Sequence, residues 1–172
     1  WVIAPQELPV GVVTAALANE QWRLDVFRSH GMIYEMSAAK IIGEPFEAFI
    51  EYKKVHKKHH PARQGVGKVA ELALGFGGWI NAMKAFGAEK YLPTDEKIKE
   101  TILAWREASP AVVHLWGSQR NGLTGLEGGI LQALRHPGQI VPVHRLDGGL
   151  TGVSYTYSDD VLYAILPSGR HL

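Results

Sequence analysis

The chain has 172 residues, 46% of them hydrophobic and 20% charged, and a formal net charge of +1. This composition is that of a globular domain and excludes collagenous or strongly biased disordered chains. The absence of cysteine excludes disulfides, thiol nucleophiles and cysteine zinc sites. No apolar run approaches the ~20 residues of a membrane-spanning helix, and no basic-then-apolar leader is visible, so we expect a soluble, cytoplasmic protein.

The first half of the chain is predicted to be helical. Ile33, Met36 and Ala39 recur at helical intervals, and Gly43 then supplies a stop. The predicted elements of this half are a short strand leading into a helix within residues 1–18, a helix over 21–43, a helix over 47–58 ended by Pro61, a helix from 65 to about 76, and a helix from about 79 to 86 ended by Gly87.

The second half is predicted to be helical at first and then to form strands. Thr94 precedes two acids, which is typical of a helix start, and this helix should run to about Ala108. The remaining predicted elements are a helix over 111–120 begun by Pro110, and short strands over 139–145, 152–157 and 161–166 separated by turns at 146–149 and 158–160. The expected fold class is therefore mainly α with a small antiparallel β-sheet (α+β).

A basic segment lies between Glu51 and Lys68, where Glu51 is the single acid. Its cations are Lys53, Lys54, Lys57, Lys58, Arg63 and Lys68, and its histidines are His56, His59 and His60. Clustered cations are typical of a phosphate-facing surface, and a solvated loop would show the same composition. The three histidines, or the pair Asp159 and Asp160, are alternative metal ligands; neighbouring lysines disfavour the first and turn chemistry explains the second.

A four-residue spacing joins Gln64, Lys68, Leu72 and Phe76. On an α-helix each step advances about 40° around the axis and about 6 Å along it, so the four would form one stripe about 18 Å long. A cation near the start of such a stripe and an aromatic ring two turns later can hold an anion and a flat ring together, as in a nucleoside triphosphate. The alternative is that Lys68 lies along apolar surface and Phe76 belongs to the core.

The run from Gly67 to Gly78 (GKVAELALGFGG) resembles the fingers helix of phage-type family A DNA polymerases. In that family an Arg, a Lys four residues later, and an aromatic residue eight after the Lys, followed by a Gly, line the incoming nucleotide. Residues 22–27, 30–45, 84–88 and 166–170 are similar to the same family, in the same order. The resemblance implies a palm remnant over 1–20, a helical fingers domain over 21–125, and a small antiparallel region over 126–172 leading back to the palm.

The resemblance also implies a role for each site residue. Lys68 would contact the triphosphate and protonate the leaving pyrophosphate, and Phe76 would stack near the nascent base pair. The other implied contacts are Tyr34 and either Arg63 or Gln64 near the phosphates, Leu72 facing the sugar, and Gly77 and Gly78 near the template. The implied partners are a deoxynucleoside triphosphate, a DNA primer–template and the rest of a phage or prophage polymerase in a bacterial host, with Mg²⁺ for the intact enzyme.

Three departures from the family pattern stand out. The residue four before Lys68 is Gln64, and Arg63 stands one position too early; Gly65 and Gly67 would let the helix start late, so that Arg63 reaches in from a loop. The position of the magnesium-binding Asp is Pro5, with Val10 and Val12 in the motif's Glu and Arg slots. The family's His-Asp-Glu motif should follow residues 166–170, where this chain ends at Leu172.

Because two-metal catalysis needs carboxylates, we expect no polymerisation by this chain alone and no metal site within it. Starting at Trp1, the chain is expected to derive from a longer reading frame. Other functions stay open. One is a stand-alone DNA-binding protein derived from a polymerase. Another is a polymerase part that is complemented by a second chain, or a remnant without activity.

Overall fold

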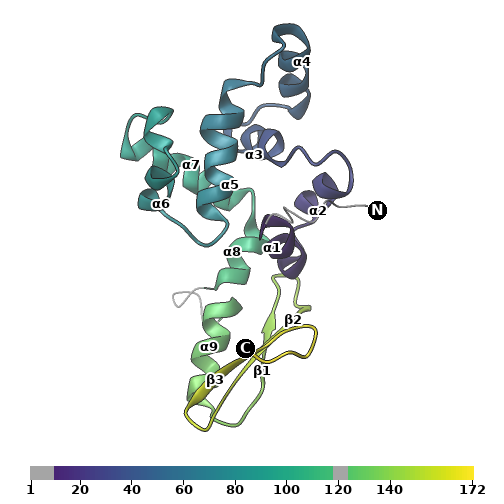
Figure 1. Ribbon diagram of the computed structural model, residues 1–172, viewed down its shortest axis with the longest axis vertical. Coiled ribbons are helices and arrows are strands. Elements are labelled where there is room, and N and C mark those ends of the chain that lie inside the picture. The colour runs from purple at the N-terminus through teal and green to yellow at the C-terminus, as the bar shows by residue number, and fades with distance from the viewer. Residues whose placement is uncertain (1–9, 118–123) are drawn as a thin grey trace. The chain divides into compact units, whose positions relative to one another are not determined.

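The computed structural model describes residues 10–117 and 124–172 of the chain, which divide into two compact units. The first unit contains residues 21–109 and those up to Val13, and the second contains 14–20 and 110–172. The expected fold class is confirmed, because helices dominate and the sheet is a small antiparallel one (Figure 1). Residues 1–9, which include the start of the strand-then-helix segment expected over 1–18 and Pro5, lie outside the described residues.

The first unit is entirely helical in its described part. Its elements are the first residues of α1 (Val10–Ala18), α2 (Gln21–Arg28), α3 (Ile33–Ile42), α4 (Phe46–His56), a π-helical turn η1 (Arg63–Lys68), α5 (Val69–Leu74), α6 (Ile80–Ala85), a 3₁₀ turn η2 (Ala88–Lys90) and α7 (Asp95–Glu107). Its fully buried large side chains are Phe49, Leu74, Met83, Ile98, Ile102 and Trp105. No helix in the described ranges combines the length and apolar character needed to cross a membrane.

The single helix predicted over 21–43 is wrong, because the structure breaks it into α2 and α3. Gly31 adopts φ +69°, which lies outside the α-helical region, and its N–H donates to the Val26 carbonyl (2.8 Å). The predicted end at Gly43 is confirmed, with φ +74° in the left-handed region. Pro61 does not end α4 either, since α4 stops at His56 and Pro61 instead begins the next helical run.

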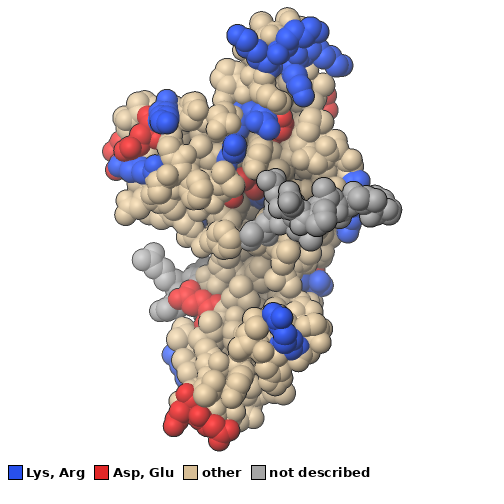
Figure 2. Space-filling view, viewed as in Figure 1, with Lys and Arg blue, Asp and Glu red and all other residues tan. Residues whose placement is uncertain are grey.

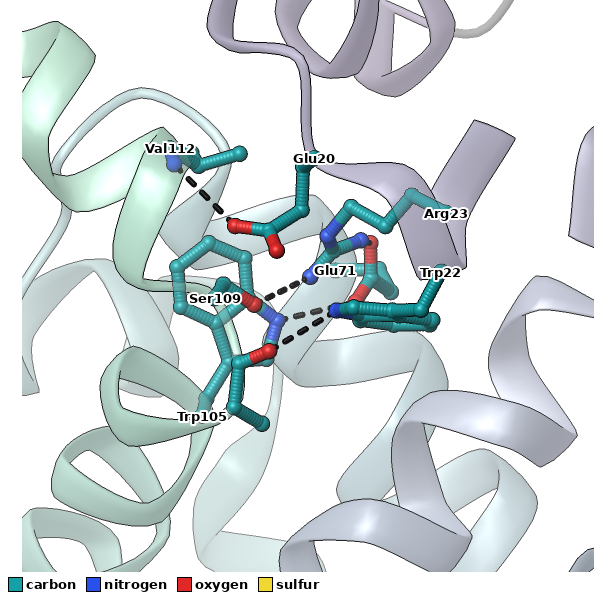
Figure 3. A network of polar contacts seen from close by, with 8 residues as sticks. Glu20, Trp22, Arg23, Glu71, Trp105, Ser109 and Val112 are labelled. Atoms are coloured by element: carbon teal, nitrogen blue, oxygen red, sulfur yellow. Dashed lines mark hydrogen bonds and ion pairs between the residues drawn. The ribbon is translucent and has the colours of Figure 1, made fainter. Parts of the chain in front are cut away.

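A buried polar network joins α2, α5 and α7 (Figure 3). The Arg23 guanidinium pairs with the Glu71 carboxylate (2.5 Å) and donates to Ser109 Oγ (2.9 Å). It also lies 4.4 Å from the ring centroid of Trp22 and 4.9 Å from that of Trp105, whose Nε1 donates to Glu71 (2.8 Å). The network fixes the position of α5, the helix that carries Leu72.

The second unit packs a helix on a three-stranded antiparallel meander, as Figure 1 shows. Its elements are the rest of α1, α8 (Pro110–Trp116), α9 (Gly125–Arg135), β1 (Val141–His144), β2 (Leu150–Ser158) and β3 (Val161–Ile165). Ala133 of α9 packs with Val143, Val153 and Tyr155 of the sheet. The predicted strands and turns are confirmed, and Asp159 and Asp160 have φ of +51° and +60°, as a tight hairpin requires.

Helix α9 was not predicted, and it occupies the start of the region expected to be β (126–172). Its apolar positions Leu126, Ile130 and Ala133 have helical spacing, but two interior glycines disfavour a helix by roughly 1 kcal/mol each. Gly129 is needed here, because a Cβ would lie 2.9 Å from the Tyr155 ring. The helix predicted over 111–120 is α8; positions 118–123 lie outside the described residues.

Candidate nucleotide-binding site

The segment with the polymerase-like spacing is not one regular α-helix. Residues 63–68 form the π-helical turn η1, α5 ends at Leu74, and Phe76 lies in the turn that follows. The prediction of a single α-helical stripe through Gln64, Lys68, Leu72 and Phe76 is therefore wrong in its geometry. Helix α5 ends there because the glycine-rich turn at 75–77 includes Gly77 at φ +77°.

The π-helical turn affects the position of Arg63, which stands one residue earlier in the sequence than the arginine of the polymerase pattern. A π-turn closes i to i+5 hydrogen bonds and so accommodates one residue more than an α-turn. Arg63 and Lys68 are five residues apart and stand at the two ends of this turn. Their relative position is therefore the one that two residues four apart would have on a regular α-helix. The extra residue in the sequence is thus absorbed by the backbone. The expectation that Arg63 reaches in from a loop is wrong, because Arg63 is helical.

Gly65 and Gly67 have a packing role and do not delay the helix. Both are buried, and α3 is the element against which η1 packs. A Cβ at Gly67 would collide with the Tyr34 carbonyl oxygen, and one at Gly65 would lie 2.5 Å from the Tyr91 ring. Gly67 therefore allows the backbone of η1 to approach α3 closely beside Tyr34, and Gly65 leaves room for the Tyr91 ring.

An apolar hollow of ≈ 180 Å³ lies beside α5. Leu72 and Phe76 both line it and are exposed, Phe76 to 74%. Its complete lining is Gly11, Phe27, Ile33, Tyr34, Glu71, Leu72, Gly75 and Phe76. An exposed aromatic ring beside an open apolar hollow can stack on a flat ligand.

A second hollow, of ≈ 380 Å³, is lined by cationic side chains, and we call it the cationic pocket. Arg63 Nε donates to Glu35 Oε1 (2.6 Å), and its guanidinium lies 5.3 Å from the centroid of the Tyr34 ring. His59 Nδ1 lies 3.3 Å from the same Glu35 oxygen. The complete lining is Phe27, Gly31, Met32, Ile33, Tyr34, Glu35, Lys53, His59 and Arg63.

The two hollows adjoin, because Phe27, Ile33 and Tyr34 line both. The arrangement has an apolar compartment with an exposed aromatic ring at one end and cations at the other. A ligand with a flat apolar group and an anionic tail matches both compartments. Of the predicted site residues, Tyr34, Leu72 and Phe76 come together in the first hollow, and Tyr34 and Arg63 in the second.

The other predicted residues line neither hollow. Lys68 is half-buried and has no hydrogen bond or ion pair among the residues that the structure describes, and Gln64 is exposed. Gly77 is exposed at the turn after α5. Gly78 is explained by packing, since a Cβ there would collide with the carbonyl oxygen of Ala73.

Sequence reasoning missed Glu35 and Glu71, and it did not assign Lys53 or His59 to the nucleotide site. Glu35 is 28 positions from Arg63, and Glu71 is 48 from Arg23, so no local spacing connects these partners. The basic composition around Lys53 was the one available signal. Figure 2 shows the lysines of this segment gathered over α4.

No group of three or more metal-ligating side chains occurs within 10–117 and 124–172. The three histidines of the basic segment contact aromatic rings or carboxylates, and Tyr52 lies against both His56 and His60. His56 lies against Tyr52, His59 is beside Glu35, and His60 packs on Phe49 with ring centroids 4.5 Å apart. The three histidines therefore do not converge on one metal-binding group within the described residues.

Comparison with known proteins supports the resemblance. The chain is 35% identical over 160 residues to the DNA polymerase of Bacillus phage SP02, a match that covers 93% of this chain and 21% of that polymerase. No protein-family model matches the chain, and no solved structure matches it. The chain thus spans about a fifth of the length of this relative. The predicted resemblance to a phage DNA polymerase is confirmed: over nearly its whole length, this sequence is similar to part of one.

Proposed function

We propose that this chain is the nucleotide- and template-binding part of a family A DNA polymerase that replicates phage or prophage DNA in the cytoplasm of a bacterial host. The observation that carries the proposal is the pair of adjoining hollows beside the polymerase-like segment, one apolar with Phe76 and one cationic with Arg63. The similarity to a phage DNA polymerase supports it independently. In this view the first unit acts as the fingers.

The proposed ligand is a deoxynucleoside triphosphate paired to a primer–template. Its phosphates would lie near Arg63 and Lys68, and its base and sugar near Phe76 and Leu72. Phosphoryl transfer depends mostly on positioning and on neutralising charge, so cations at the phosphate end are what the reaction needs from this part. Lys68 would also give a proton to the leaving pyrophosphate.

The divalent metals are not assigned to residues of this chain. The intact enzyme would use Mg²⁺ to activate the nucleophile and to stabilise the leaving group. The first Asp in the sequence is Asp25, and the family's magnesium-binding position is Pro5. We therefore propose that these 172 residues bind nucleotide and template but do not extend a primer without carboxylates from elsewhere.

Nucleotide titration of matched variants tests the proposal. Lys68→Ala and Phe76→Ala should each weaken binding of a deoxynucleoside triphosphate about tenfold, because each removes a contact with one end of the ligand. Lys90→Ala and Phe86→Ala remove the same side chains at exposed positions outside the polymerase-like segment. If the two pairs of variants weaken binding equally, the proposed site is wrong.

A second function is favoured by the exposed lysines over α4, namely binding of DNA without catalysis. Lys53, Lys54, Lys57 and Lys58 are all exposed and make no ion pair within the described residues. Such a surface would bind DNA with an affinity that falls steeply with salt, because phosphate contacts release counterions. Strong salt dependence with no effect of nucleotide would favour this function over the first.

A further inference from the structure

The cationic pocket contains side chains that the polymerase resemblance does not assign. We propose that Lys53 and His59, together with Arg63, form a pocket for the polyphosphate tail of the bound nucleotide. This inference deepens the proposed function and rests on it for the identity of the ligand. It concerns residues outside the motif that runs from Gly67 to Gly78.

Three separate segments bring basic side chains to this pocket. Lys53 comes from the last turn of α4, His59 from the loop after α4, and Arg63 from η1. The ammonium of Lys53 has no hydrogen bond or ion pair with any residue that the structure describes. A cation that lines a hollow without a partner is available to an anionic ligand.

The carboxylate in the pocket contacts both Arg63 and His59. One oxygen of Glu35 accepts from Arg63 Nε at 2.6 Å and lies 3.3 Å from His59 Nδ1. The side chain of Glu35 is 9% exposed and that of Arg63 is 23% exposed, so the carboxylate lies deeper than the guanidinium. The two permanent cations, Lys53 and Arg63, outnumber the one carboxylate, and the pocket favours an anion.

The size and position of the pocket suit a polyphosphate. Its ≈ 380 Å³ lies within the range of about 300–1,000 Å³ that is common for small-ligand sites. Tyr34 lines both this pocket and the apolar hollow. A nucleotide with its base beside Phe76 can therefore extend its phosphates past Tyr34 toward Arg63, His59 and Lys53.

The chain supplies a matched control for Lys53 and one for His59. Lys54 follows Lys53 on α4 and is also exposed, but it does not line the pocket. His56 is exposed and packs on Tyr52, also outside the pocket lining. Lys53→Ala and Lys54→Ala change the net charge equally, so general electrostatic attraction affects both variants alike.

The test is calorimetric titration of the 172-residue chain with inorganic tripolyphosphate, with a deoxynucleoside triphosphate and with the corresponding deoxynucleoside. Lys53→Ala and His59→Ala should weaken binding of both phosphate compounds about fivefold and leave the nucleoside unaffected. Lys54→Ala and His56→Ala should stay within about twofold of the unchanged chain. Lys53→Arg, which keeps the charge, should retain most of the affinity.

Equal effects of Lys53→Ala and Lys54→Ala would overturn this inference, even where Phe76→Ala still weakens nucleotide binding and the proposed function stands. The converse result is also decisive. If tripolyphosphate binds in a manner that depends on Lys53 while Phe76→Ala changes nothing, the polyphosphate pocket stands and the proposed nucleotide site fails. Failure of the unchanged chain to bind either phosphate compound would overturn both.

Discussion

The buried ion pair between Arg23 and Glu71 ties three helices together. The two side chains are 3% and 9% exposed, and Glu71 also accepts from Trp105 Nε1. Removing one member of such a pair leaves the other charge buried without its partner. Arg23 Nε already lacks a hydrogen-bond partner within the described residues. Loss of the Glu71 carboxylate would therefore leave a second part of the buried guanidinium without a partner.

We therefore predict that Glu71→Gln lowers the free energy of unfolding by about 3 kcal/mol. Asp25→Asn makes the same chemical change in an exposed pair with Arg28 and should cost less than about 1 kcal/mol. Urea unfolding followed by tryptophan fluorescence measures both. Comparable values for the two variants would show that the Arg23 network contributes little to stability.

A second residue-scale prediction concerns acid stability. The pKa of Asp147 is lowered from 3.8 to about 2, first by the hydrogen bond from Asn19 Nδ2 and then by the Gly149 N–H and by Arg145. Because the folded-state pKa is the lower one, the stabilisation is complete above about pH 4 and is lost as the pH falls toward 2.

Asp147→Asn should remove this acid dependence. The thermal midpoint of the unchanged chain is expected to fall more steeply between about pH 4 and 2 than that of the variant. Differential scanning calorimetry across that range makes the comparison. Parallel pH profiles for the two proteins would contradict the assignment, as would an ordinary carboxyl pKa for Asp147 measured by NMR.

At the scale of elements, the π-helical turn decides whether Arg63 takes the arginine position of the polymerase pattern. Deleting Gln64 leaves Arg63 four residues before Lys68 and keeps both packing glycines. The shortened segment should form a regular α-helix with Arg63 in the same place, because a π-turn differs from an α-turn by one residue.

We expect the Gln64 deletion to keep its thermal midpoint or raise it, and to bind a deoxynucleoside triphosphate within about twofold of the unchanged chain. Thermal melting by circular dichroism and nucleotide titration provide the two readouts. Arg63→Ala should weaken nucleotide binding to the same extent in the deletion background and in the full chain. Loss of folding, or of nucleotide affinity, in the deletion itself would contradict the equivalence.

The elements that sequence predicted correctly are those with a local chemical signal. Thr94 caps α7 by accepting from the Lys97 N–H (3.3 Å), as its position before two acids indicated. The hairpin at Asp159 and Asp160 is another such case. The errors arose where tertiary contacts override local preference: at Gly129, which lies against Tyr155, and at Gly67, which lies against Tyr34.

The candidate site could be predicted only in part, for a related reason. The spacing of Lys68, Leu72 and Phe76 was visible in the sequence, and the structure brings the last two to one hollow. Glu35 and Arg63 lie 28 positions apart and meet only after α3 and η1 pack together. The π-turn itself left one trace in the sequence, a spacing of five where the family pattern has four.

At the scale of the whole molecule, the chain consists of two compact units with separate cores. In the second unit, a buried carboxylate stabilises the start of α8. Glu20 accepts hydrogen bonds from the N–H groups of Ala111 (2.9 Å) and Val112 (3.2 Å). Both candidate hollows belong to the first unit. The proposed nucleotide contacts therefore require only the packing within that unit.

The central claim is that the chain binds an incoming nucleotide opposite a template base. The most direct measurement is the dissociation constant of the 172-residue chain for a primer–template, determined by fluorescence anisotropy with each of the four deoxynucleoside triphosphates in turn. The account predicts tighter binding with the nucleotide complementary to the templating base and no comparable change with the other three. Equal binding with all four nucleotides and without nucleotide would contradict it.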